Sequence, residues 1–396
     1  MSPSRENRID LVRGISLLLI YVDHANVSFS ETLQQSRGFS DAAELFVMMA
    51  GMSAALAYHP SSGRADFLTV AARTLKRSFK LYRIHLTLLL ALATAVLLVP
   101  LPNHETLVSN WSLRPLTDDP ARFAFEAMLL RYLPAELDIL PLYIVLIASV
   151  PLWFALTDRS PRLALAVSVF LWLSAGLFHV NLTDLSQPKG VWYFNPFSWQ
   201  MVFLIGLLGG LRVRRGLAPF PYVRPLFLAA LAICVLAVPA NLLVHFGGHA
   251  AEAPLRLLIS KTSEGPMRLI NALAIVYVVF NLDALRRIEP TGWLRPIYAA
   301  GRNSLPIFVA GTILSDLVTA LVIGSGGLKL PIELVVVFLG IVLQLWFALD
   351  RDRRKRDPSR RAARSLLVAS DDDRGYDRTP PNVSYPMSDA ARDPAT

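Results

Sequence analysis

The sequence is poor in charged residues. Asp, Glu, Lys and Arg make up 17% of its 396 residues, whereas hydrophobic residues make up 54%. Ordinary globular domains contain about 25% charged and about 45–50% apolar residues. This composition excludes a soluble protein with an ordinary surface and indicates that lipid covers much of the chain.

Cysteine and the common catalytic motifs are also scarce. The one cysteine, Cys234, lies in an apolar segment, so the chain has neither a disulfide framework nor a Cys-rich metal site. The G-x-S-x-G, H-E-x-x-H, Walker A and G-x-G-x-x-G motifs are missing from the sequence. We therefore predict no bound metal and no permanently bound cofactor.

The basic charge balance does not indicate a nucleic-acid partner. The formal net charge is +9, but the Lys and Arg residues are spread over many loops rather than gathered on one soluble face. Basic residues beside apolar segments are typical of loops that face anionic lipid headgroups.

Long apolar runs dominate the sequence instead. A helix rises about 1.5 Å per residue, so roughly 20 apolar residues cross about 30 Å of hydrocarbon. Ten runs approach this length and predict an all-α, polytopic membrane bundle of about ten transmembrane helices. The runs are 9–27, 40–58, 79–101, 137–156, 163–180, 196–211, 225–246, 269–285, 304–323 and 328–349.

The loop charges predict the orientation of these helices. Only nine of the 39 Lys and Arg residues fall in the alternate loops that begin after the first run. Because cytoplasmic loops retain positive charge, both termini are predicted to be cytoplasmic. A shorter run, 123–133, contains Arg131 and is predicted to be an interfacial helix. We expect residues 1–350 to form the membrane domain and residues 351–396 a basic, then disordered, cytoplasmic tail.

The first run contains charged residues, which are costly inside a membrane and therefore indicate a function. Arg13 and His24 are eleven residues apart, which places them within roughly 20° on one helix face and about 16.5 Å apart along it. Arg13 is a candidate for binding the phosphates of cytosolic acyl-CoA, and His24 is a candidate general base near the outer surface. Alternatively, Arg13 snorkels and His24 caps the helix.

Carboxylates accompany His24 on the predicted outer side. Asp23 precedes it, and Asp41 and Glu44 open the second run. Glu44 is a candidate for holding the imidazole N–H and stabilising the imidazolium. Asp23 is a third catalytic candidate, although it lies about 100° around the helix from His24. The alternative for Asp41 and Glu44 is a favourable interaction with the helix dipole.

Polar residues at the outer ends of two later runs are candidates for binding the acceptor. Asp138 opens the fourth run, and Asn195, Trp199 and Gln200 open the sixth. Aromatic faces flanked by amides suit a sugar, although an aromatic belt would also place Trp199 at the interface.

Two further cations are candidates for binding CoA phosphates from the inner side. Arg302 precedes the ninth run in a segment that resembles an anion-binding helix N-terminus. Arg83 belongs to the basic cluster of the second cytoplasmic segment, most of which is explained by positive-inside anchoring.

These stretches together resemble the OpgC family of bacterial membrane proteins, within the acyltransferase-3-like superfamily. The spacing of Arg13 and His24 is similar to the arginine–histidine pair of that superfamily, whose histidine is the proposed catalytic base. Ala50 is a departure, because the wider family usually has a serine there. The matching stretches are 8–14, 23–24, 38–44, 137–143, 194–200 and 301–305.

The resemblance implies transfer of an acyl group, succinyl in the family's named function, from cytosolic acyl-CoA to osmoregulated periplasmic glucans, by an enzyme of the bacterial inner membrane. The alternative is a transporter or flippase for a glycan or lipid-linked glycan, in which the same residues bind substrate or relay protons. Transporters often contain inverted repeats, and the Asp23–His24 feature has no counterpart after the fifth run.

Overall fold

The computed structural model describes residues 6–60, 63–98, 103–247 and 255–356. Within these ranges the chain forms helices and no β-strand, with one isolated bridge between Thr183 and Val191. Its contacts divide the chain into two units, 1–349 and 350–396. Of the second unit, residues 350–356 are described and are helical, whereas the tail predicted to be disordered, 357–396, lies outside the described residues.

Each predicted apolar run contains helix in the structure. The fourth run is divided, because α8 and α9 are bent by 45° where they meet at Ser149, and the eighth run, 269–285, continues past the end of α15 at Asn281 into the short helix α16. Pro151 lies in the first turn of α9 and cannot donate a backbone hydrogen bond, which favours a bend at this point. The helices of the runs are α1 (Asn7–His24), α3 (Ala42–Tyr58), α4 (Phe67–Leu98), α8 (Ile139–Ala148), α9 (Val150–Arg159), α10 (Pro161–Phe178), α11 (Pro196–Arg214), α12 (Arg224–Phe246), α15 (Pro266–Asn281), α18 (Ser304–Gly324) and α19 (Leu330–Arg356).

Six of the described helices are long and apolar enough to cross a membrane, and seven if the bent pair α8–α9 is one span. They are α4, α10, α11, α12, α18 and α19, whereas α3 and α15 are apolar but shorter. The structure therefore supports a multi-pass membrane protein. The number of ten spans and the cytoplasmic position of both termini stay predictions.

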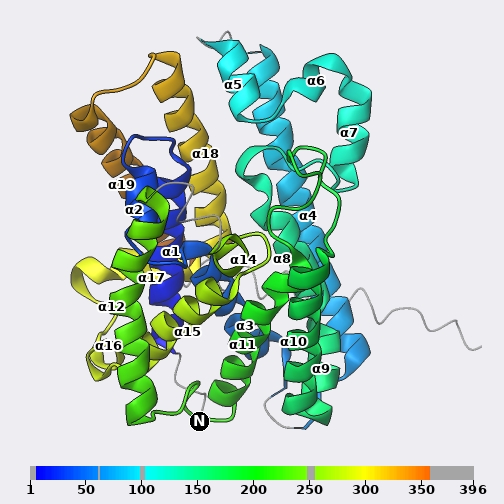
Figure 1. Ribbon diagram of the computed structural model, residues 1–396, viewed down its shortest axis with the longest axis vertical. Helices are drawn as coiled ribbons and strands as arrows, with labels where there is room; N and C mark the ends of the chain where they lie inside the picture. Colours follow the sequence, from blue (N-terminus) through cyan, green and yellow to red (C-terminus); the bar gives the residue numbers. More distant parts are fainter. Residues whose placement is uncertain (1–5, 61–62, 99–102, 248–254, 357–396) are drawn as a thin grey trace, which may run out of the picture. The chain divides into compact units, whose positions relative to one another are not determined.

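Short helices connect the long ones. Of the segment 123–133, predicted to be an interfacial helix, the part up to Met128 is helical and Arg131 lies beyond the helix, and Figure 1 shows α5, α6 and α7 grouped near one end of α4. The short helices are α2 (Ser30–Gln35), α5 (His104–Asn110), α6 (Arg114–Asp118), α7 (Pro120–Met128), η1 (Ala135–Leu137), α14 (Arg256–Ile259), α16 (Asp283–Arg287), η3 (Gly292–Leu294) and α17 (Arg295–Arg302).

Helices α3 and α11 make the most extensive contact in the first unit. A Cβ atom on Gly206 would collide with the carbonyl oxygen of Met48, and one on Gly51 would collide with that of Phe203. Glycine thus permits a close approach of the two backbones, as in small-residue interfaces of membrane helices. Gly210 approaches the carbonyl oxygen of Met52 in the same way, one turn further along both helices than Gly206 and Met48, so α3 and α11 are parallel and their polar first turns lie at the same end.

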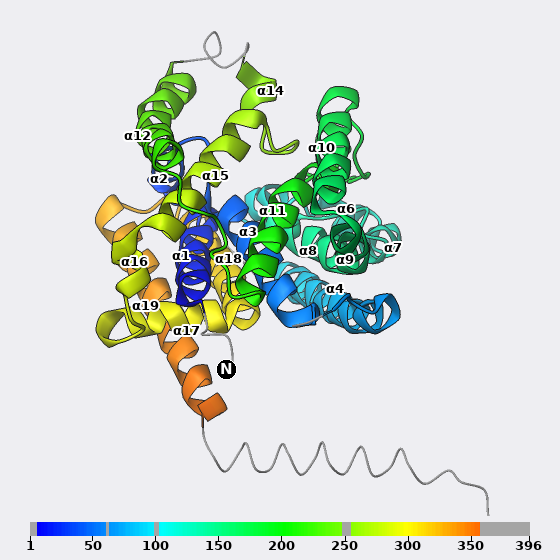
Figure 2. The same ribbon diagram turned by 90° about the horizontal axis from the view of Figure 1, so that it is seen from below.

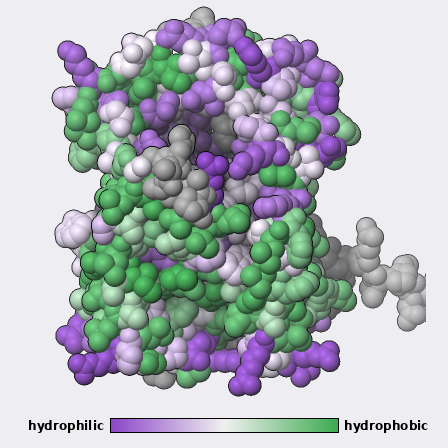
Figure 3. All heavy atoms as spheres, in the orientation of Figure 1, coloured by the Kyte–Doolittle hydropathy of each residue, from purple (hydrophilic) through white to green (hydrophobic). Residues whose placement is uncertain are grey.

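The helices of the first unit group around this pair. Viewed along the helices, Figure 2 shows α1, α3, α11 and α18 between one group of α12, α15 and α16 and another of α4, α8, α9 and α10. Figure 3 shows hydrophobic side chains in a broad band across one face, with hydrophilic ones along the lower edge and in the upper part. Such a band is what a lipid-covered protein requires.

The close approach of α3 and α11 predicts the effect of enlarging Gly206. Gly206→Ala should destabilise the protein by about 1–3 kcal/mol, because the methyl group has to displace the Met48 backbone. The measurement is the thermal unfolding midpoint of the detergent-solubilised protein.

The matched control is Gly176→Ala in the last turn of α10, where an added Cβ meets nothing within 4 Å. This variant should be neutral or slightly stabilising, since alanine favours helix over glycine. Equal unfolding midpoints for the two variants would contradict the packing argument.

Candidate functional site

The site is assembled at the end where α3 and α11 begin, which is the predicted outer end. His24 is the last residue of α1, and its Nδ1 lies 3.4 Å from Oε2 of Glu136 in η1. The two side chains are 29% and 30% exposed, so substrate can reach them. An imidazole and a carboxylate thus meet from two segments more than 100 residues apart, a pair that the sequence did not predict.

Glu44 does not contact His24 as the sequence analysis expected. Its carboxylate is completely buried and accepts a hydrogen bond from Arg268 Nε at 2.8 Å, with a second contact from Nη2. Glu44 also accepts the backbone N–H of Asp41 at 2.9 Å, and Asp41 accepts that of Ala43, which forms a capping box at the start of α3. Glu44 therefore stabilises the N-terminus of α3, as in the second interpretation of the sequence, and it also forms an ion pair with Arg268.

Asp23 is held by a different cation. Arg37 Nη2 lies 2.6 Å and 2.7 Å from the two carboxylate oxygens of Asp23. This contact joins the end of α1 to the segment that follows α2 and occupies both oxygens. The structure therefore gives Asp23 a role in fixing the chain beside His24 and does not bring its carboxylate to the imidazole.

Lys261, in the loop between α14 and α15, is a residue that the sequence analysis did not single out. Its Nζ lies 2.6 Å from Asp41 Oδ2 and 5.7 Å from the ring centres of Tyr193 and Phe194. Burial alone would lower the pKa of this ammonium, but the carboxylate of Asp41 raises that pKa above its ordinary value. Lys261 is therefore a fixed positive charge paired with Asp41.

Several carboxyl groups lie around His24 and Glu136. Asp138 precedes α8 without a side-chain cap hydrogen bond and is buried, and Asp316 lies in α18. Burial first, and then the charges of Asp316 and Asp138, raise the pKa of Glu136 well above its ordinary value. The signal for Asp316 was available in the sequence, because it is a charged residue inside a predicted span.

The residues predicted to bind a sugar at the start of α11 are engaged in the fold. Asn195 caps α11 through Phe197 N and donates to Val180 O at 2.7 Å. The side chain of Trp199 is completely buried and donates to Lys261 O at 2.9 Å, and Gln200 is buried against Ser168. The polar atoms of these three side chains bond to other parts of the protein, so their geometry supports a role in holding the neighbouring segments in position.

At the other end of α1, Arg13 lines a cavity of about 270 Å³ between α1, α3, α4, α8 and α18. Its guanidinium donates to Ser53 Oγ at 3.2 Å and contacts Ser304 Oγ. Arg13 and Arg77 are the cations among the residues that line it, and aromatic side chains such as Tyr143 and Phe308 form much of its wall. A mostly apolar cavity with a cation at depth suits an extended chain that carries a polar group.

The two other predicted phosphate ligands do not line this cavity. Arg302 is the last residue of α17, two residues before Ser304, and Arg83 is exposed on α4. The close approach of Gly301 to the backbone of Asp10 shows that the segment around Arg302 serves the packing of α17 against α1.

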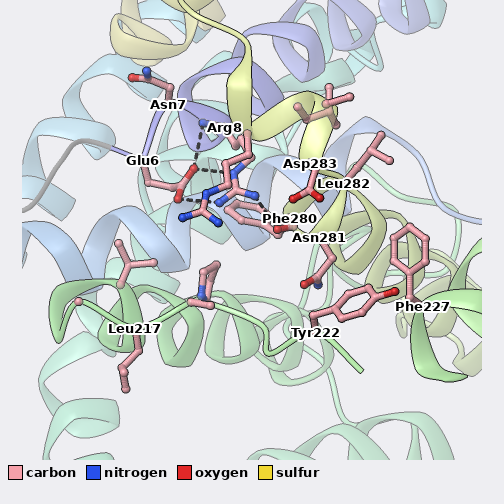
Figure 4. A pocket seen from close by; sticks show the side chains of 17 residues that line it. Glu6, Asn7, Arg8, Leu217, Tyr222, Phe227, Phe280, Asn281, Leu282 and Asp283 are labelled. Atoms are coloured by element: carbon pink, nitrogen blue, oxygen red, sulfur yellow. Dashed lines mark hydrogen bonds and ion pairs between the residues drawn. The ribbon is translucent and has the colours of Figure 1, made fainter. Parts of the chain in front are cut away.

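A larger cavity of about 890 Å³ lies beside the start of α1 (Figure 4). Arg8 projects into it, but its guanidinium is paired with Glu6 at 2.6 Å and 2.9 Å and donates to Phe280 O at 2.5 Å. Asp283 and Arg286 also line the cavity, so its acidic and basic groups balance. A phosphate-rich ligand needs a net positive lining, which this cavity does not provide.

The fold and the site together define a multi-pass helical membrane protein with an ionisable cluster at one end of α1 and an arginine-lined cavity at the other. The chain belongs to the OpgC family, because the family model described as OpgC protein matches residues 5–356. This match confirms the resemblance seen in the sequence and indicates a membrane transferase that modifies glucans. No curated protein and no solved structure matches the chain significantly.

The ion pair of Glu44 and Arg268 predicts a strong loss of stability when one partner is removed. Arg268→Met should destabilise the protein by about 3–5 kcal/mol, because it leaves the completely buried Glu44 carboxylate without its cation. Unfolding midpoints measured in detergent check this. The double variant Glu44→Gln with Arg268→Met should recover much of the loss, and a double variant as unstable as the single one would contradict the explanation.

Proposed function

We propose that the protein is an acyl-CoA-dependent O-acyltransferase that moves an acyl group from the inner to the outer side of the membrane. The observation that supports this is that α1 carries a candidate general base at one end and a cavity-lining arginine toward the other. His24 meets Glu136 at one end of the helix, and Arg13 lines a mostly apolar cavity at the other. Eleven residues of helix separate them by about 16.5 Å, which an extended thioester arm can cover.

The donor enters at the inner end in this proposal. Acyl-CoA is a co-substrate rather than a resident cofactor. Its thioester arm lies in the cavity between α1, α3, α4, α8 and α18, where Arg13 and Arg77 offer the positive charge. The apolar wall of the cavity favours the arm, whose thioester end extends toward His24.

His24 acts as the general base at the outer end. Nδ1 faces Oε2 of the Glu136 carboxylate at 3.4 Å, which leaves Nε2 to take the proton of an acceptor hydroxyl as its oxygen attacks the thioester carbon. The imidazolium then returns the proton to the departing CoA thiolate. The positive charge that forms on His24 favours ionised Glu136 and so opposes the effect of burial on that carboxyl group.

The acceptor is a hydroxyl of an extracytoplasmic glucan, and the acyl group is succinyl, as the family resemblance implies. Carboxylates bind sugar hydroxyls well because each oxygen accepts hydrogen bonds. Asp138, which follows η1 two residues after the Glu136 that meets His24, is the residue we assign to the acceptor. The enzyme then lies in the inner membrane of a bacterium, with its acceptor in the periplasm.

Removing either member of the dyad should abolish transfer. His24→Asn removes the base, and Glu136→Gln removes the charge that stabilises the imidazolium, so kcat should fall about 10²–10⁴-fold in the first variant and less in the second. The measurement is transfer of a radiolabelled acyl group from succinyl-CoA to a glucan by purified protein in detergent.

The matched control is His179→Asn, at an exposed histidine that ends α10 with a φ of 55°, a backbone conformation that asparagine tolerates. It should keep wild-type activity. Full activity of folded His24→Asn would overturn the mechanism, and wild-type protein without activity toward any acyl-CoA would favour the transport alternative.

A further inference from the structure

The cavity of about 890 Å³ beside the start of α1 lies where four helices of the apolar runs begin or end. Helix α1 begins at Asn7, α11 ends at Arg214, α12 begins at Arg224 and α15 ends at Asn281. In a membrane protein the ends of apolar helices lie near the level of the lipid headgroups. The cavity is therefore placed where a headgroup can enter it.

The loop between α11 and α12 forms one wall of this cavity and is fixed in position. Arg212 Nε donates to Ala218 O at 2.9 Å, and Tyr277 Oη donates to Pro221 O at 2.8 Å. Val223 N donates to Tyr277 Oη at 2.9 Å. Because α11 and α15 hold this loop at both ends, the cavity is formed before a ligand arrives.

The charged groups of the lining divide into a paired set and an unpaired set. Arg8 Nε lies 2.6 Å from Glu6 Oε1, and Arg8 also donates to Phe280 O (Figure 4). Asp283 and Arg286, both on α16, have no ion-pair partner among the residues that the structure describes. One carboxylate and one guanidinium are thus left for a ligand.

The spacing of Asp283 and Arg286 indicates what such a ligand carries. The two residues are three apart in α16, and side chains three apart on a helix are neighbours, with about 5–6 Å between their Cβ atoms. A ligand with a cation and an anion joined by a short linker can meet both at once. A ligand that is only anionic would be repelled by Asp283.

The lining also has an apolar part that reaches the molecular surface. Leu217, Tyr222 and Leu282 line the cavity and are exposed. Val223 and Leu226, at the start of α12, are exposed as well and continue this apolar surface along the helix. A ligand with apolar chains can cover it while its polar part enters the cavity, which favours a lipid over a small soluble zwitterion.

We propose that this cavity binds the headgroup of phosphatidylethanolamine, a phospholipid that carries an ammonium and a phosphate. The Asp283 carboxylate accepts hydrogen bonds from the ammonium, and the Arg286 guanidinium donates to the phosphate. The rings of Tyr222 and Phe227, whose centres are 5.7 Å apart, lie against the apolar chains. Neither His24 nor Arg13 lines the cavity, so this inference does not depend on the proposed acyl transfer.

The test measures the thermal unfolding midpoint of the delipidated full-length protein in detergent, with added phospholipids of identical acyl chains. Phosphatidylethanolamine should raise the midpoint in a concentration-dependent way, because a ligand of the folded state stabilises it. Phosphatidylcholine and phosphatidylglycerol should raise it less, since the first has no ammonium N–H and the second no cation. Asp283→Asn and Arg286→Gln should each weaken phosphatidylethanolamine binding by about tenfold.

The matched controls are Glu289→Gln and Arg287→Gln, at exposed residues outside the lining, and both should bind as the wild type does. The midpoint without lipid reports whether each variant is folded. Equal midpoints with phosphatidylglycerol and phosphatidylethanolamine, or an unchanged response in both folded cavity variants, would overturn the inference. An equal response to glycerophosphoethanolamine, which lacks acyl chains, would also overturn it and would point to a soluble ligand.

Discussion

The outer end of the protein depends on compensated burial of charge. Asp41 and Glu44 open α3 inside the protein, and Lys261 and Arg268 from the α14–α15 region neutralise them. Unpaired, these groups would be too costly to bury. The close packing of α3 on α11 brings the start of α11 to the same place, where it holds the loop of Lys261. The burial of these carboxylates, their pairing with Lys261 and Arg268, and the position of the Lys261 loop therefore depend on one another. His24 and Glu136 lie at the same end of the protein.

The helices could be predicted from the sequence because apolar runs are local and end at proline, asparagine or charged residues. The run predicted over 304–323 corresponds to α18, which ends at Gly324, and the run predicted to begin at Pro196 corresponds to α11, which begins at that residue. The bend between α8 and α9 was missed although Pro151 marks it, because membrane helices also tolerate proline in their interior. How many of these helices span the membrane depends on the surrounding lipid as well as on the sequence.

The site was predictable only in part, because pairing between charges is a property of the tertiary structure. Helical periodicity placed Arg13 and His24 on one face of one helix, and the structure finds them at a cavity and beside a carboxylate. The sequence favoured Glu44 as the carboxylate, since it lies at a similar depth, but Arg268 from α15 occupies it. Glu136 and Lys261 lie in η1 and a loop, where no periodicity indicates which residues will meet.

The central claim is that donor and acceptor meet from opposite sides of the membrane. It is tested most directly with sealed inverted membrane vesicles, to which labelled succinyl-CoA is added outside while the glucan is enclosed in the lumen. The account predicts labelled glucan in the lumen, dependent on the protein, with the vesicles intact. Labelling that occurs only when donor and glucan share one side of the membrane would contradict it.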